Sequence, residues 1–142
     1  MKKLLCISLF LPLLLVAGLN VNKVSNTLVH LESVRANEVL KFFNANEKIK
    51  LNNSLKFTSL EKANIVLFPK KNTNKISIVD SYKKLQENKK SIGAIYLKKG
   101  RTEIIFINER LKDNGLRLPN SYNKHLLSEC QINPVCLLSD MK

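Results

Sequence analysis

Apolar and polar positions follow different periods along this chain. Between residues 25 and 44 the apolar residues recur close to the helical period of 3.6, and Ser25, Asn26 and Thr27 are each suited to cap a helix. The apolar positions are Leu28, Leu31, Val34, Val39, Phe42 and Phe43. This spacing predicts one long amphipathic helix over 25–44.

The next segments have patterns typical of strands and loops. Ile49 and Leu51, and then Leu55 and Phe57, alternate with polar residues on either side of a turn at 52–54, which predicts a half-buried hairpin. Residues 63–68 form a continuous apolar run that Pro69 ends, which predicts a strand covered on both faces in the middle of a sheet. A basic loop over 70–75 and a short strand over 76–79 come next.

The clearest element is a hairpin over 92–107. Two apolar strands, 92–97 and 103–107, flank Lys98-Lys99-Gly100-Arg101, where Gly100 can adopt the left-handed conformation of a tight turn. Before the hairpin, Asp80 or Ser81 is expected to cap a polar helix.

After the hairpin, Asn108 is expected to cap a short helix that stops at Gly115, and a last helix is expected to start near Asn120. These elements predict an α/β (α+β) fold, a single small domain in which helices pack on both faces of a mixed sheet.

The N-terminus has the features of an export leader. Met1, Lys2 and Lys3 precede an apolar stretch over 4–19, which is shorter than a spanning helix requires. We expect residues 1–18 to be a signal peptide cleaved near Gly18, and residues 19–142 to be one domain in the periplasm or outside the cell. Alternatively, the segment is not cleaved and anchors the protein in a membrane. We expect membrane contact only through such an uncleaved segment.

Loss of the leader would leave two of the three cysteines. Cys130 and Cys136 lie six residues apart, and an oxidising compartment favours a disulfide between them. A metal site with His125 would lack a fourth ligand, and the Cys-x-x-Cys-His motif of haem attachment is absent from the sequence. No metal or cofactor is predicted.

Catalytic groups are sparse in the sequence. His30 and His125 are the two histidines, and Glu129 follows His125 by one helical turn, a spacing common in solvated pairs. Glu103 and Glu109 are the nearest candidates for a pair of acids, but nothing in the pattern makes them face each other. Without a glycine-rich phosphate loop, no nucleotide cofactor is predicted, and we expect a protein that is not an enzyme.

Positive charge is the strongest compositional feature. The formal net charge is +13, or +11 without the two leader lysines. Basic residues crowd the middle of the chain, where the candidate anion-binding residues are Lys83, Lys84, Lys98, Lys99 and Arg101. Their partner would be an anionic polymer or lipid, such as an envelope polysaccharide, a lipid headgroup or nucleic acid. Biased codon usage is the alternative source of this lysine content.

The order of several short segments resembles the end of YfiR-like periplasmic regulators. The resemblance spans about residues 63–129 and rests on the segments 92–96, 100–101, 104–108 and 115–116 and on the final helix. It implies a sensor that binds and restrains a membrane-bound signalling enzyme, with disulfides that affect stability, and it implies no site residue. The chain is also similar to small exported bacterial proteins of unknown function.

Two functional hypotheses follow from the sequence. The first is a non-enzymatic exported binding or regulatory domain with an envelope protein as partner. The second is a basic electrostatic binder of an anionic polymer or lipid. The first requires an exposed apolar patch or cleft, and the second requires a continuous positive face.

Overall fold

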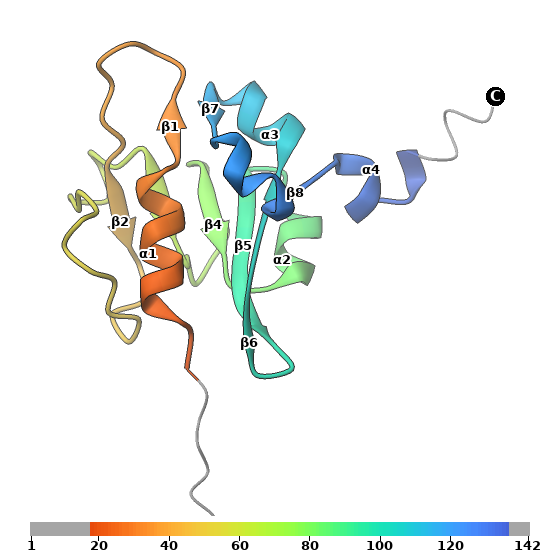
Figure 1. Ribbon diagram of the computed structural model, residues 1–142, viewed down its shortest axis with the longest axis horizontal. Helices are drawn as coiled ribbons and strands as arrows, with labels where there is room; N and C mark the ends of the chain where they lie inside the picture. Colours follow the sequence, from red (N-terminus) through yellow and green to blue (C-terminus); the bar gives the residue numbers. More distant parts are fainter. Residues whose placement is uncertain (1–17, 137–142) are drawn as a thin grey trace, which may run out of the picture.

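A six-stranded mixed sheet forms the centre of the computed structural model, which describes residues 18–136. The strand order is β2-β3-β4-β5-β6-β8 (Figure 1). The strands are β2 (Phe42–Asn44), β3 (Ile65–Leu67), β4 (Ser77–Val79), β5 (Ser91–Lys98), β6 (Arg101–Ile107) and β8 (Leu126–Leu127). Strands β2 to β5 are parallel, β6 is antiparallel to β5, and β8 is parallel to β6.

Helices and a small second sheet complete the domain. The helices are α1 (Val21–Val29), α2 (Tyr82–Glu87), α3 (Asn108–Asp113), the 3₁₀ helix η1 (Asn120–His125) and α4 (Glu129–Ile132). Strand β1 (Glu32–Ser33) pairs antiparallel with β7 (Leu116–Arg117).

Two apolar layers lie on opposite faces of the sheet. On one face, Val24 and Leu28 of α1 belong to a buried cluster with sheet residues such as Phe106. On the other face, Leu85 of α2 and Ile132 of α4 are buried in a cluster with Ile105 and other residues. The structure therefore confirms the predicted mixed sheet with helices packed on both faces.

The interior strand β3 and the hairpin agree with the sequence pattern. All three residues of β3 are buried between β2 and β4. The β5–β6 register pairs Lys98 with Arg101 around a two-residue turn, in which Lys99 and Gly100 have φ angles of 50° and 75°. Positive φ at both positions gives the turn a twist that suits a tight hairpin.

The long helix predicted over 25–44 is wrong. Helix α1 starts at Val21 because the Asn20 side chain accepts from the backbone N–H of Lys23 at 3.0 Å, and it ends at Val29. Ser25 and Thr27 are thus buried within the helix and are not its cap. Parallel pairing with β3 buries Phe42 in β2, so tertiary pairing overrides the apparent helical period.

The hairpin predicted over 49–58 is also wrong. Phe57 instead makes a parallel bridge to Phe42. The backbone N–H of Phe42 donates to the carbonyl of Lys56 at 2.8 Å, and the N–H of Thr58 donates to the carbonyl of Phe42 at 2.9 Å. The segment therefore runs along the outer edge of β2, where it satisfies the edge backbone groups that a hairpin would have left open.

Smaller elements are partly as predicted. Ser81 caps α2, and the helix before Gly115 exists, with Gly115 at a φ of 65°. Asn108, however, is the first residue of α3, and Ile107 occupies the cap position without a side-chain bond. The segment from Asn120 is a 3₁₀ helix that leads into β8, a strand that the sequence pattern did not predict.

Candidate functional site

Cationic side chains follow the parallel strands at the edge of the sheet where those strands end. They are Lys48 after β2, Lys70 and Lys71 after β3, Lys83 and Lys84 after β4, and the hairpin tip after β5. The carboxyl ends of parallel strands are the usual position of binding sites in open α/β sheets. We call this the basic edge.

The hairpin projects beyond the other strands at the basic edge. Val79, the last residue of β4, pairs with Ala94, and β5 continues for four more residues to Lys98, which is about 13 Å. Figure 1 shows the tip at the bottom, beyond the ends of β2 and β4. Thr102 braces its base, because the hydroxyl accepts from the N–H of Asn20 at 2.7 Å and the carbonyl accepts from Lys23 Nζ at 3.1 Å.

The five predicted anion-binding residues fall into two groups at this edge. Lys83 Nζ lies 3.8 Å from a Glu87 oxygen and Lys84 Nζ lies 2.7 Å from an Asp80 oxygen, so neighbouring carboxylates offset their charges. Lys98, Lys99 and Arg101 are exposed, and no carboxylate among residues 18–136 lies within 4.0 Å of their charged groups. The hairpin cations are therefore the stronger candidates.

A groove of about 480 Å³ lies beside the hairpin. It is lined by Tyr82 of α2, Tyr96 and Lys98 of β5, Glu103 and Ile105 of β6, and Leu127 of β8. Tyr96 and Glu103 are cross-strand partners. Alternate residues of a strand lie on the same face, so the sequence alone could have placed positions 96 and 98 together. It could not have placed Tyr82 beside them, because the position of Tyr82 depends on the packing of α2.

The surroundings of Tyr96 in this groove change its acidity. Burial, and then the negative charges of Glu103 and Tyr82, raise the pKa of Tyr96 above its usual value of 10.0. The Tyr96 phenol therefore stays protonated at neutral pH and can donate a hydrogen bond, while the Glu103 carboxylate can only accept.

The two catalytic pairs considered from the sequence, one of histidine with glutamate and one of two glutamates, do not form. His125 is buried, its Nδ1 lies 3.0 Å from the carbonyl oxygen of Ile104, and burial is the main cause that lowers its pKa. Its predicted partner Glu129 binds Arg110 instead. Glu103 lies in β6 close to the hairpin tip, whereas Glu109 lies in α3, beyond the other end of that strand.

His30 caps the end of α1 and does not lie inside a helix. Its Nδ1 lies 3.0 Å from the hydroxyl of Tyr122, whose ring centroid is 5.1 Å from that of His30 and 6.1 Å from that of His125. This aromatic row joins α1 to η1 and has a packing role.

Cys130 and Cys136 are paired as a disulfide, with Cα atoms 5.3 Å apart, which confirms that these two cysteines are placed to form one. In the part of the chain that the structure describes, no group of three or more His, Cys, Asp and Glu residues could hold a metal ion.

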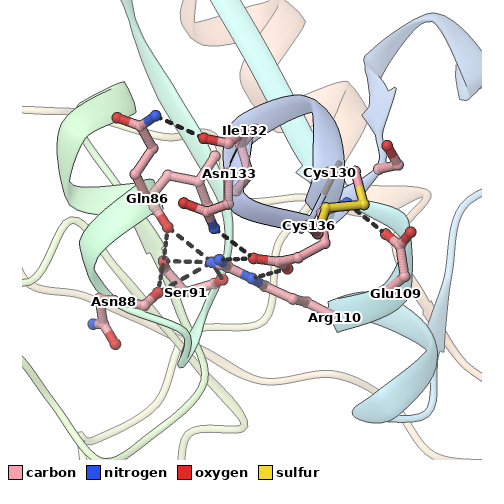
Figure 2. A network of polar contacts seen from close by, with 12 residues as sticks. Gln86, Asn88, Ser91, Glu109, Arg110, Cys130, Ile132, Asn133 and Cys136 are labelled. Carbon is pink, nitrogen blue, oxygen red and sulfur yellow. Dashed lines mark hydrogen bonds and ion pairs between the residues drawn. A yellow bond between two sulfur atoms is a disulfide. The ribbon is translucent and has the colours of Figure 1, made fainter. Parts of the chain in front are cut away.

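The disulfide adjoins a polar network that the sequence did not reveal (Figure 2). Arg110 Nη1 donates to the carbonyls of Leu85, Asn88 and Ser91 at 2.8, 3.1 and 2.9 Å. Its Nε and Nη2 donate to the two carboxylate oxygens of Glu129 at 2.8 and 2.6 Å. The network fixes α2 against β5 and α4.

Comparison of the chain with protein-family models, with curated proteins and with solved structures finds no match in any of the three. Within residues 18–136, no helix has both the length and the apolar character needed to cross a membrane. The predicted signal peptide over 1–18 lies outside the described residues except for Gly18.

Substitution of the buried arginine tests the network. We expect Arg110→Met to lower the free energy of unfolding by about 3 kcal/mol, because it removes the buried ion pair with Glu129 and the charged donor to three carbonyls. The matched control is Arg117→Met, which removes an exposed pair with Glu32 and should cost less than about 1 kcal/mol. Urea denaturation measures both, and equal losses would contradict the assignment.

The buried histidine predicts a pH dependence. Because the folded protein holds the pKa of His125 below 6.5, the unfolded chain binds the proton first as the pH falls. The stability is therefore fully present above pH 6.5 and declines below it, until the folded histidine is also protonated. Urea midpoints between pH 7.5 and 5 should show this decline, and His125→Gln should reduce it, whereas His30→Gln should not. A decline of the same size in all three proteins would argue against a role for His125.

Proposed function

We propose that this protein is a non-enzymatic binding domain of the periplasm or the cell exterior that holds an anionic polymer at its basic edge. The observation that carries the proposal is the hairpin tip, where Lys98, Lys99 and Arg101 project beyond the sheet and no described carboxylate lies within 4.0 Å of their charges.

The overall charge supports this function. A formal net charge of +11 without the leader lysines attracts polyanions over the distance of a Debye length and accelerates their encounter. Lysine supplies most of the basic edge, and its compact charge on a flexible stem suits contacts with a polymer of variable shape. Binding would release counterions and so weaken steeply with added salt.

The proposed location rests on the N-terminal sequence and the cysteines. Residues 1–18 have the pattern of an export leader, and a disulfide such as Cys130–Cys136 persists in oxidising compartments. An uncleaved leader would instead hold the same domain at a membrane surface.

A regulatory domain that restrains a protein partner is the second candidate. It is favoured by the resemblance to YfiR-like regulators and by a cleft of about 620 Å³ between the 34–40 loop and residues 54–56. Val29, Val34 and Val39 line this cleft and are 44%, 57% and 54% exposed. Exposed apolar side chains around a hollow are typical of protein interaction sites.

Neutralisation of the hairpin tests the primary proposal. The triple variant Lys98→Gln, Lys99→Gln and Arg101→Gln should bind duplex DNA, used as a polyanion of known charge density, at least about 10-fold more weakly at low salt. The slope of log affinity against log salt should fall by about 2 to 3. Fluorescence anisotropy between 25 and 200 mM salt measures both.

The matched control removes three charges at the opposite edge, through Arg35→Gln, Lys41→Gln and Lys112→Gln. Their side chains make no hydrogen bond or ion pair among residues 18–136, and we expect the salt slope to change by less than about 1. Equal losses in the two triple variants would mean that net charge alone, and not the basic edge, drives binding.

A regulator that docks through the cleft would instead bind its protein partner independently of salt. The substitution Val34→Glu in the cleft would then abolish that binding.

A further inference from the structure

The groove beside the hairpin points to the class of polymer that the basic edge holds. We infer that Tyr82, Tyr96 and Glu103 bind hydroxyl-bearing sugar residues, so that the ligand is an acidic polysaccharide, such as a polymer of uronic acids. This inference rests on the proposed function and goes beyond it, since positive charge alone would not distinguish one polyanion from another.

Polar groups in the groove are available to a ligand. The side chains of Tyr82, Tyr96, Lys98 and Glu103 all line it, and none has a hydrogen-bond or ion-pair partner among residues 18–136. Two phenols, one carboxylate and one ammonium therefore converge from α2, β5 and β6. Small-ligand sites commonly combine a few such groups with an apolar wall.

The carboxylate of Glu103 decides between kinds of polyanion. It lies in the same groove as Lys98 and next to the hairpin cations, where it repels a phosphate or a carboxylate of the ligand. A carboxylate accepts hydrogen bonds, and sugar hydroxyls donate them. The phosphates and sugars of a DNA backbone carry no such donors along the chain, whereas every residue of a uronic-acid polymer carries hydroxyls beside its carboxylate.

The remaining walls of the groove suit a sugar ring. Ile105 and Leu127 are apolar, and the two tyrosines combine an aromatic surface with a polar tip. A pyranose has C–H faces that fit apolar and aromatic walls, and hydroxyls at its rim that fit Tyr96 and Glu103. A volume of about 480 Å³ lies within the range of small-ligand sites. Lys98 and its strand partner Arg101 would then meet the carboxylates of the polymer.

The experiment compares alginate, which carries carboxylates and hydroxyls, with polyacrylate, which carries carboxylates without hydroxyls, against the variant Glu103→Val. Valine keeps the strand propensity and removes the acceptor. Because the variant loses one negative charge, electrostatics alone would strengthen the binding of both polymers. We expect the affinity for alginate to fall by about 10-fold and the affinity for polyacrylate to stay the same or rise.

Two further variants keep the test sharp. Glu61→Val removes an exposed carboxylate outside the groove and should leave both affinities within about twofold. Tyr96→Phe keeps the ring, removes one hydroxyl, and should weaken alginate binding by about 3-fold without an effect on polyacrylate. Unfolding midpoints of all variants would be measured alongside, so that a loss of fold is recognised.

Stronger binding of both polymers by Glu103→Val would overturn the sugar-binding groove and leave the basic edge as the proposed site. Failure of the parent protein to bind either polymer at low salt would overturn the proposed function itself.

Discussion

The buried guanidinium of Arg110 is the interaction on which the second face of the domain depends. It lies in α3, is 5% exposed, and bonds to one carbonyl each of α2, its C-cap and β5, and to Glu129 in α4. Loss of the arginine would remove a charged donor from acceptors in the interior, which weakens their hydrogen bonding even where Ser91 also donates to the same carbonyls. The disulfide and the bond from Gln86 to the carbonyl of Ile132 hold the same short helix α4 in place. One polar centre thus orders both helices that cover this face.

The position of the candidate site follows from this order and from the strand directions. Since β2 to β5 are parallel, the residues that follow each of them gather at one edge, and the longer β5 and β6 carry their turn past the others. Helix α2 starts at the same edge, and Arg110 binds its C-terminal end, while Tyr82 in its first turn lines the groove with Tyr96 and Glu103. The same strand arrangement therefore positions both the charged hairpin tip and the groove with donors and acceptors beside it.

The sequence correctly predicted the elements that depend on residues close to one another in the chain. Gly100 between two apolar strands specified the hairpin, and Pro69 after a continuous apolar run marked the end of the interior strand β3. The segment from 30 to 44 was predicted wrongly because Phe42 gains more from pairing with β3 than from continuing a helix, which no local pattern reveals. Arg110 was missed for the same reason, since its partners lie 19 to 25 residues away. At the site, the hairpin cations were predicted, whereas the groove required the packing of α2.

A titration followed by backbone amide chemical shifts would show whether an acidic polysaccharide binds at the hairpin and the groove, because it locates the bound polymer on the folded domain. With short alginate oligomers as ligand, we expect the largest shift changes at residues 96–103 and 80–84, with changes at 1 M salt much smaller than at 25 mM. Changes centred on the 34–40 loop, or spread evenly over both edges of the sheet, would contradict that expectation.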